Sequence, residues 1–329
     1  MSLEEISSVI RSLTDGEIVE LKPLSGGVSC LVYLVATSRG RWVVKKALPR
    51  LMVQEEWVAD VNRIFRESAC LKAIRELVGE DTAPKVLLED RQHHMFVMEY
   101  GEGGVTWKEM LMKGRIEPSI TYRAAQILAK LHTRSGGLEW VRKEFSEATN
   151  FHQLRVDPYI LHTARKHPDI AGKLFEIADL LLTRKMCLVH GDYSPKNILY
   201  LRDGRLWVLD CEPAHYGHPG FDIAFCTNHL LLKSIHFNGS AYLREAGRLW
   251  REYWRGVGVD GGGALEREAA MVLSALMLAR VDGKSPVEYL SEENRVRTRL
   301  LAKKMIRDGV DSFEELSRRV EEEIRCDDI

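Results

Sequence analysis

The sequence predicts an α+β protein with a small β-rich N-terminal lobe and a large, mostly helical C-terminal lobe. Runs rich in β-branched residues lie within the first ~100 residues, and the pattern becomes mostly helical from residue 119 onward. Gly101, Gly103 and Gly104 lie between these regions and favour a hinge. We therefore expect an N-terminal nucleotide-binding lobe over 1–98, a hinge over 99–104, and a catalytic and substrate-binding lobe over 105–329.

The N-terminal lobe should contain four strands and one long helix. A turn at Ser38-Arg39-Gly40 separates the first two strands, and a polar segment separates the last two. Apolar residues at helical spacing predict the helix over residues 54–78. The runs that predict strands are residues 28–35, 42–46, 86–88 and 95–98.

Two segments of the C-terminal lobe depart from simple amphipathic helices. Between Cys187 and Asp210, two short apolar runs flank Asp203-Gly204, which predicts a β-hairpin. The nearly apolar run from Ala269 to Ala279 is shorter than the ~20 residues that span a bilayer. We expect it to form a buried helix.

Composition favours a cytoplasmic globular protein with no nucleic-acid or membrane partner. Apolar residues make up 45% of the chain and charged residues 29%, and the net charge of -1 creates no global field that attracts polyanions. The six cysteines show no C-x-x-C pair, which is typical of reduced thiols in a cytosol. The first residues lack the basic start and apolar core of a signal peptide.

The strongest chemical signal is the segment from Leu188 to Leu199, LVHGDYSPKNIL, which is followed by Asp210. Phosphoryl transfer from ATP needs a carboxylate that orients the acceptor hydroxyl and oxygen ligands that hold Mg²⁺ on the phosphates. Asp192 and Asn197 lie five residues apart on one loop. Asp210 ends the second strand of the predicted hairpin, which can return it to the same place.

These residues resemble the motifs of the aminoglycoside phosphotransferase and choline kinase family. The pattern H-G-D-x-x-x-x-N at 190–197 is followed by L-D-x-E at 209–212 and by G-x-P-x-x-D at 217–222. The resemblance covers roughly residues 20–225 and extends distantly to protein kinases, so it implies a protein-kinase-like fold with ATP and Mg²⁺ as cofactors.

The same resemblance implies individual roles. Asp192 would be the catalytic base, and Asn197 and Asp210 would be magnesium ligands. His190 and Asp222 would stabilise the catalytic loop.

Two short segments also resemble methylthioribose kinases. These are Val44-Lys45-Lys46-Ala47-Leu48-Pro49 and the D-x-E form of residues 210–212. In that form Glu212 is either a further metal ligand or a polar neighbour of the site. Asn197 departs from that branch, whose loop generally lacks it.

The N-terminal lobe offers a lysine and a carboxylate that could act together. Because side chains alternate along a strand, Lys45 and Lys46 point to opposite faces, and only one can reach the cleft. The analogy with protein kinases favours Lys45. Glu67 lies within the apolar stripe of the predicted helix, where a carboxylate should be paired, and Lys45 is its candidate partner. The alternative is a rotated helix that leaves Glu67 in water.

Two further segments are candidates for nucleotide binding. Ser25, Gly26 and Gly27 lie in a loop whose backbone amides could approach phosphate oxygens, although a plain hairpin turn explains the same residues. Glu99 and Tyr100 follow the last predicted strand, where backbone groups at the hinge could contact the adenine edge.

We expect an ATP-dependent phosphotransferase that acts on a hydroxyl of a small molecule, such as a sugar or amino alcohol. The alternatives are an aminoglycoside kinase and a catalytically silent nucleotide-binding protein with a kinase fold. Residues 225–233 contain Asn228, His229 and one lysine, and no carboxylate follows until Glu245. This favours a neutral or singly charged acceptor over a substrate with several ammonium groups.

Overall fold

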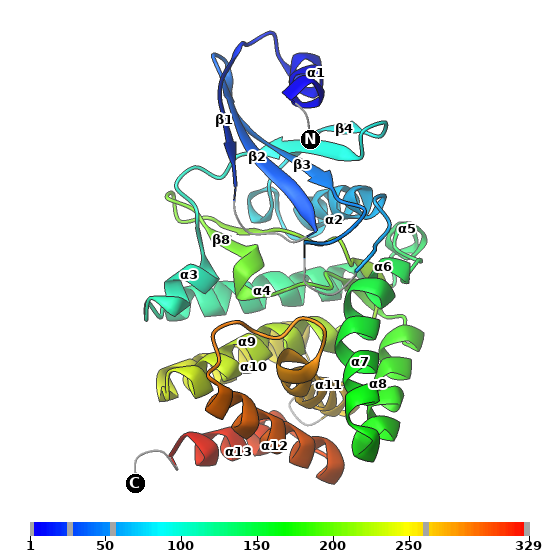
Figure 1. Cartoon of the computed structure of the whole chain (residues 1–329), viewed down its shortest axis with the longest axis vertical. Helices are drawn as coiled ribbons and strands as arrows, with labels where there is room; N and C mark the ends of the chain where they lie inside the picture. Colours follow the sequence, from blue (N-terminus) through cyan, green and yellow to red (C-terminus); the bar gives the residue numbers. More distant parts are fainter. Residues whose placement is uncertain (1–2, 25–28, 53–56, 259–262, 326–329) are drawn as a thin grey trace.

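The computed structural model describes residues 3–24, 29–52, 57–258 and 263–325. Its N-terminal part contains a five-stranded antiparallel sheet, and the rest is mostly helical (Figure 1), which confirms the predicted α+β class. The sheet has the order β1-β2-β3-β5-β4. Its strands are β1 (Ile18–Pro23), β2 (Cys30–Thr37), β3 (Gly40–Ala47), β4 (Val86–Asp90) and β5 (Met95–Glu99).

Each face of this sheet packs against a different helix. Val44 on β3 belongs to a cluster with Ile6 and Val9 of α1 (Leu3–Leu13), a helix that the sequence patterns did not predict. Val43 and Ala47 belong instead to the cluster that contains the buried side of α2 (Arg63–Leu77). The alternation along β3 therefore directs Lys45 toward α2 and Lys46 toward α1.

Helix α2 is shorter than the predicted helix over 54–78, so that prediction was wrong at its start. The helix begins at Arg63, and residues 53–56 lie outside the described part of the chain. Val58 forms an isolated bridge with Arg50, and the Asp60 carboxylate accepts a hydrogen bond from the backbone of Asn62 at 2.9 Å. These local bonds hold the residues before Arg63 outside a helix.

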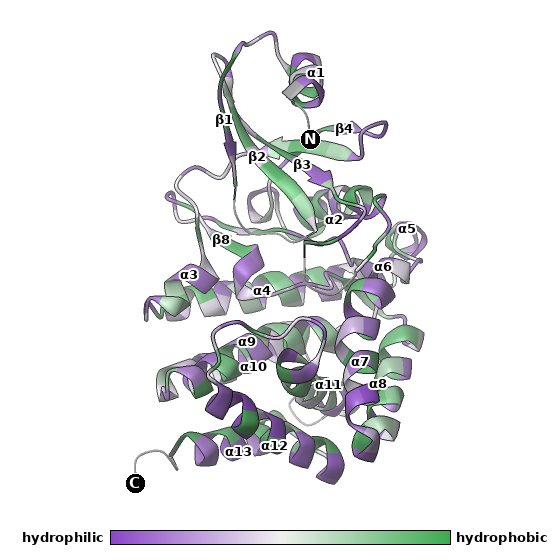
Figure 2. Ribbon diagram, in the orientation of Figure 1, coloured by the Kyte–Doolittle hydropathy of each residue, from purple (hydrophilic) through white to green (hydrophobic). Residues whose placement is uncertain are grey.

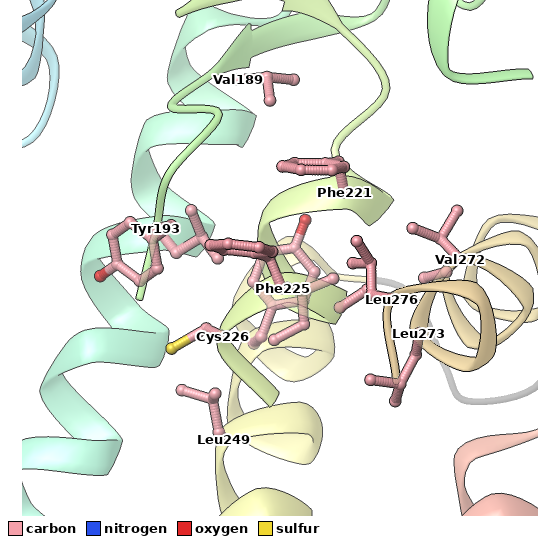
Figure 3. Packing of buried hydrophobic residues seen from close by; sticks show 14 of the residues in the cluster. Val189, Tyr193, Phe221, Phe225, Cys226, Leu249, Val272, Leu273 and Leu276 are labelled. Atoms are coloured by element: carbon pink, nitrogen blue, oxygen red, sulfur yellow. The ribbon is translucent and has the colours of Figure 1, made fainter. Parts of the chain in front are cut away.

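The helical part packs around α9 (Gly220–His236), which is buried along nearly all of its length. The Phe221 and Phe225 rings stack with their centroids 5.4 Å apart, and Leu276 of α11 (Ala264–Asp282) points toward them (Figure 3). The predicted buried run lies within α11, as expected, while the outer helices α12 (Glu292–Asp308) and α13 (Phe313–Arg325) are largely hydrophilic (Figure 2). No helix in the described ranges is long and apolar enough to cross a bilayer.

The other helices form the frame around this core. They are α3 (Trp107–Met112), α4 (Pro118–Ser135), α5 (Glu139–Glu144), α6 (Thr149–Phe151), α7 (His162–Lys166), α8 (Ala171–Thr183), α10 (Ser240–Val257), α12 (Glu292–Asp308) and α13 (Phe313–Arg325), with a π-helical stretch, η2 (His152–Leu161), and the short 3₁₀ turns η1 (Glu80–Thr82), η3 (Pro168–Ile170) and η4 (Pro195–Asn197).

Short strands in the helical part position the loops of the sequence motif. The predicted hairpin is confirmed: β8 (Ile198–Tyr200) pairs with β9 (Leu206–Val208), and β6 (Val105–Thr106) pairs with β8. Gly204 adopts a φ of 86° in the turn, a conformation that favours glycine. A second pair, β7 (Cys187–Val189) with β10 (His215–Gly217), ends directly before His190.

Candidate active site

Lys45 lies between two carboxylates from distant parts of the chain. Its Nζ is 2.6 Å from Oε2 of Glu67 on α2 and 2.6 Å from Oδ1 of Asp210. Lys45 is 5% exposed and Glu67 only 1% exposed, so water screens the pair weakly. The predicted pairing of Lys45 with Glu67 is confirmed, and the alternative of a solvated Glu67 was wrong.

Burial and mutual charge shift the pKa values of this group. Burial raises the pKa of Glu67 above its usual value, with Lys45 acting in the opposite direction. Burial also lowers the pKa of Lys45, but Asp210 and Glu67 outweigh it and raise that pKa well above its usual range. Burial likewise raises the pKa of Asp210, yet Lys45 and then Lys196 hold it far below the ordinary value. Lys45 is therefore a cation and Asp210 an anion at neutral pH.

Glu212 connects the sheet to the segment that carries Asp210. Its Oε2 accepts a hydrogen bond from Nε of Arg63 at 3.1 Å, and its Oε1 accepts one from the Cys30 thiol at 2.7 Å. Arg63 is fully buried and also donates to the carbonyls of Ser29 and Leu48. We did not identify Arg63 from sequence, although its position four residues before Glu67 places both on one helix face.

Three carboxylates could hold a divalent cation. One oxygen each of Glu67, Asp210 and Glu212 can lie within 4.8 Å of the others, and carboxylate oxygens suit Mg²⁺. Both Glu212 oxygens already accept hydrogen bonds, one from Nε of Arg63 and the other from the Cys30 thiol. The donor set fits a hard cation, and Asp210 is its most strongly anionic member.

A backbone hydrogen bond between the ends of the neighbouring strands β8 and β9 brings Asp210 close to Asn197. The amide of Leu209 donates to the carbonyl of Asn197 at 2.9 Å, which joins the end of β9 to the start of β8. Asp210 itself has a φ of 64°, in the left-handed region that aspartate tolerates at a cost of roughly 1–2 kcal/mol. Such strain is often found at functional sites.

The Asp192 carboxylate is buried, being 3% exposed, and is held by three partners. Asn197 Nδ2 donates to its Oδ2 at 2.8 Å, and Lys196 Nζ lies 3.0 Å from the same oxygen. Arg155 contacts Oδ1 at 2.8 Å and donates from Nε to the Gly191 carbonyl. Two of these partners were not identified from the sequence: Arg155, which comes from η2 and belongs to no motif, and Lys196, which lies within the motif itself.

The loop before Asp192 is held in place by Asp222. This buried carboxylate accepts hydrogen bonds from the backbone amides of His190 at 2.6 Å and Gly191 at 2.8 Å, and it contacts His132 Nε2 at 3.2 Å. His190 Nδ1 in turn accepts from the Asp192 amide at 3.1 Å. The expected loop-stabilising positions of His190 and Asp222 are therefore confirmed.

Gly191 is required at its position for two reasons. Its φ is 78°, and a Cβ there would lie 2.8 Å from the Cβ of Pro213 and 2.9 Å from the Pro213 carbonyl. Any other residue would strain the loop and push Asp192 away from its partners.

A cavity of about 320 Å³ lies between the sheet and the helical part. Its polar wall contains the candidate residues Lys45, Glu67, Asn197 and Asp210. Its apolar wall would suit a flat heteroaromatic ring. That wall includes Leu24, Val32, Val43, Met98, Tyr100, Leu199, Trp207 and Leu209.

The candidate nucleotide-binding segments meet this cavity in part. Glu99 and Tyr100 line it, but the Glu99 amide donates to the Lys85 carbonyl and its carboxylate accepts from the Lys85 amide. Ser25, Gly26 and Gly27 lie outside the described residues. Ser29, which follows that loop, does line the cavity.

A second cavity of about 110 Å³ adjoins Asp192 on the side of the helical core. Phe225, His229 and Lys233 line it from one face of α9, at intervals of four residues. Asn228, on the same helix, is fully buried and is not among the lining residues. Lys196 lines both cavities and so lies at their junction.

Comparison with known proteins identifies the family and the fold. Residues 20–256 match the model of the phosphotransferase enzyme family. Methylthioribose kinase of Yersinia enterocolitica is 28% identical over 258 residues, which cover 70% of this chain and 64% of the relative. The matched region thus spans less than two thirds of that relative's length.

Solved structures share the fold. Choline kinase LicA from Streptococcus pneumoniae superposes with a TM-score of 0.53 at 18% identity, covering 93% of this chain and 99% of its own. Amicoumacin kinase hAmiN gives a TM-score of 0.58 at 13% identity, covering 94% of each chain. Because the family match covers well over half of the sequence, this chain belongs to the phosphotransferase enzyme family, with a protein-kinase-like fold.

Proposed function

We propose that this protein is an ATP-dependent phosphotransferase that moves the γ-phosphate to a hydroxyl of a small molecule. The observation that carries the proposal is the junction of the two cavities. Lys45 and Asp210 line the larger cavity, Asp192 lines the smaller one, and Lys196 lines both. A nucleotide in the first and an acceptor in the second would meet beside Asp192.

In this proposal Asp192 is the catalytic base. An acceptor hydroxyl donates its hydrogen bond to the Asp192 carboxylate, which takes the proton as the hydroxyl oxygen forms a bond to the γ-phosphorus. The bond between that phosphorus and the bridging oxygen breaks, and its electron pair leaves with ADP. Arg155 and Asn197 fix the carboxylate, so its orientation does not depend on the acceptor.

The phosphate side needs positive charge. We propose that Lys45 contacts the nucleotide phosphates and that Glu67 orients it, while Lys196 faces the group in transfer. Asn197 and Asp210 would hold Mg²⁺, which when bound neutralises charge on the phosphate oxygens. Glu212 remains a further candidate ligand, and its bonds to Arg63 and Cys30 also support a purely positioning role.

The remaining assignments follow from this proposal. Residues 1–98 would bind the nucleotide, with Ser25, Gly26 and Gly27 near its phosphates and Glu99 and Tyr100 near its base. Residues 99–104 would act as the hinge, and residues 105–329 would supply the catalytic loop and the acceptor site. Five buried cysteines in the described residues are free thiols, which suits the reducing, ATP-rich cytoplasm.

A sugar-like polyol is the acceptor that the relatives favour. The Yersinia relative is named for methylthioribose, and the Val44–Pro49 run of this chain already resembles that branch. An amino alcohol or an aminoglycoside would need carboxylates around the acceptor cavity, and the charges there are considered in the next subsection.

The test is acceptor-dependent release of ADP by the purified protein. A screen would cover sugars, polyols, amino alcohols and aminoglycosides, with Asp192→Asn beside the wild type and Asp203→Asn, in an exposed turn, as the matched control. We expect Asp192→Asn to lower kcat by ~100 to 10,000-fold with little change in Mg·ATP affinity.

Two results would contradict the proposal. Wild-type protein that binds ATP but releases no ADP with any acceptor in the screen would be a silent nucleotide-binding protein. Wild-type turnover by a folded Asp192→Asn protein would exclude Asp192 as the base.

A further inference from the structure

We propose that the acceptor carries an anionic group, a carboxylate or a phosphate, bound by Lys233 and Arg280 in the second cavity. This inference rests on the proposed function and defines its substrate class. It places a negative charge at the inner end of the acceptor site, with the reactive hydroxyl at Asp192.

The charged residues around the cavity have a positive excess. Lys108, Lys196, Lys233 and Arg280 line it, against the two carboxylates of Asp192 and Glu288. Asp192 already contacts Arg155, and Glu288 forms an ion pair with Lys108. The cations come from α3, η4, α9 and α11, so only the folded chain brings them together.

A neighbouring histidine responds to this field. Burial first, and then the charges of Arg280, Lys233, Lys196 and Lys108, lower the pKa of His229 well below its usual range. His229 is therefore neutral near pH 7 and adds a hydrogen-bonding group to the cavity without adding charge.

Lys233 is the central observation. Its side chain is 1% exposed, and no described carboxylate lies within ion-pair distance of its Nζ. Within the described chain, Nζ donates to the His229 carbonyl at 3.3 Å and lies 4.8 Å from the centroid of the Tyr289 ring. An ammonium group that is buried with so little compensation is costly to fold, and a bound anion would supply the missing charge.

Two neighbouring polar groups also lack partners. Arg280 is 9% exposed and uses one nitrogen to contact Tyr159 and Ser285, but its buried Nε has no hydrogen-bond partner in the described residues. The buried hydroxyl of Tyr289 has none either. Both residues line the same cavity as Lys233. Together they offer a guanidinium donor and a hydroxyl donor to anionic oxygens.

These cations are placed for the acceptor rather than for the nucleotide. Lys233, Arg280 and Lys108 line the second cavity and are absent from the wall of the first. Lys196, at the junction, is the cation that both ligands would share. A substrate with ammonium groups would meet Lys233 and Arg280 with no free carboxylate in the described wall, so like charges would exclude it.

The first experiment measures anion binding without turnover. Sulfate is titrated calorimetrically into the full-length protein, with and without saturating Mg·ADP. We expect Lys233→Met, which keeps the length of the side chain, to weaken sulfate binding at least tenfold in both conditions. Sulfate held in the nucleotide cavity would instead be displaced by Mg·ADP and lost in Lys45→Met.

Matched variants keep this experiment decisive. Glu288→Gln removes the rim carboxylate and should tighten sulfate binding, whereas Lys46→Met, which removes a lysine on the far face of the sheet, should leave it unchanged. Thermal unfolding of each variant verifies that it is folded. Equal sulfate affinity in wild type, Lys233→Met and Glu288→Gln would overturn the proposal.

The second experiment compares acceptors that share a hydroxyl-bearing backbone and carry an anionic, neutral or cationic group at one end. Glycerate, glycerol 3-phosphate, glycerol and 3-amino-1,2-propanediol form one series, and ribose 5-phosphate and ribose form another. We expect kcat/KM to be at least tenfold higher for an anionic member than for its neutral counterpart, with that advantage lost in Lys233→Met. The carboxylate and phosphate members identify which anion is preferred.

The outcomes separate this inference from the proposed function. Lys233-dependent sulfate binding without any ADP release would contradict the phosphotransferase activity alone. Two results together would contradict the anionic acceptor alone. Turnover of the neutral or cationic members would equal or exceed that of the anionic members, and sulfate affinity would be the same in wild type and Lys233→Met.

Discussion

Lys45 and Lys46 are adjacent on β3 but form ion pairs on opposite faces of the sheet. Lys45 Nζ lies 2.6 Å from Glu67 of α2, whereas Lys46 Nζ lies 2.7 Å from Glu5 of α1. The first pair borders the larger cavity, and the second lies behind the sheet. The same substitution at Lys46 is therefore a matched control for a substitution at Lys45.

We predict that Lys45→Met lowers kcat/KM for ATP by roughly 100-fold or more, because a fixed cation at the phosphates would be lost. Lys46→Met should change kcat/KM only a few-fold. Steady-state kinetics with ATP as the varied substrate measure both. Similar losses in the two variants would mean that the effect comes from general destabilisation.

Asp210→Asn and Glu212→Gln should impair different properties of the protein, the first Mg²⁺-dependent ATP affinity and the second folding stability. Asp210→Asn should abolish most of the enhancement of ATP affinity by Mg²⁺, since it removes an anionic oxygen ligand. Glu212→Gln should keep that enhancement but lower stability by about 3–5 kcal/mol, because it leaves the buried Arg63 without its carboxylate. ATP titrations with and without Mg²⁺, combined with denaturant unfolding, separate the two. Loss of the Mg²⁺ effect in a stable Glu212→Gln protein would assign Glu212 as a ligand.

Asp222 should make the loop that carries Asp192 sensitive to acid. Burial opposes ionisation, but the hydrogen bond and charge of His132 hold the pKa of Asp222 below its usual value. A lowered folded-state pKa contributes stability that is present above the unfolded value of about 3.9 and is lost as the pH falls through the folded value. Asp222→Asn should therefore be less stable than wild type at pH 7, by a margin that shrinks below pH 4.

Denaturant unfolding of wild type and Asp222→Asn between pH 3 and 7 tests this expectation. Asp203→Asn replaces an exposed aspartate and is the control for the loss of one carboxylate. A stability difference for Asp222→Asn that stays constant with pH would show that the ionised carboxylate is not what stabilises the loop.

Lys233 should make anion binding depend on pH. Burial, followed by the charge of Lys108, lowers its pKa to about 7 from an unfolded value near 10.4. As the pH rises through 7 the folded protein loses this proton while the unfolded chain keeps it, so stability rises from about pH 7 toward 10. The anion needs the charged form, and its affinity should fall by up to tenfold per pH unit above 7. The charged and titratable groups that act on Lys233 are Lys108, Glu288, Arg280, Cys226 and the neighbouring His229 and His236.

Sulfate, a dianion throughout this range, is the appropriate probe from pH 6 to 9. Lys233→Arg keeps its charge at all these values, so its affinity profile should be flat. A wild-type profile as flat as that of Lys233→Arg would exclude Lys233 as the titrating group.

Much of the polar wall of the larger cavity was predictable from the sequence. Asp192, Asn197, Asp210 and Asp222 lie within one short stretch of the chain and form a recognisable motif. Strand alternation alone places Lys45 and Lys46 on opposite faces of the sheet. Glu67 was identifiable because a carboxylate within an apolar stripe needs a partner. The start of α2 was predicted incorrectly, because Asp60 and the bridge between Arg50 and Val58 compete with helical hydrogen bonds.

The lining of the second cavity was decided only by the tertiary structure. From sequence, residues 225–233 offered one lysine and neutral groups, whereas folding brings Lys108 of α3 and Arg280 of α11 to the same cavity as Lys233. Long-range packing likewise brings Arg155 to Asp192, which lies 37 residues further along the chain. Local patterns determine helices, strands and turns, but the charge of a cavity is the sum of side chains that meet through long-range packing, and no spacing in the sequence records that sum.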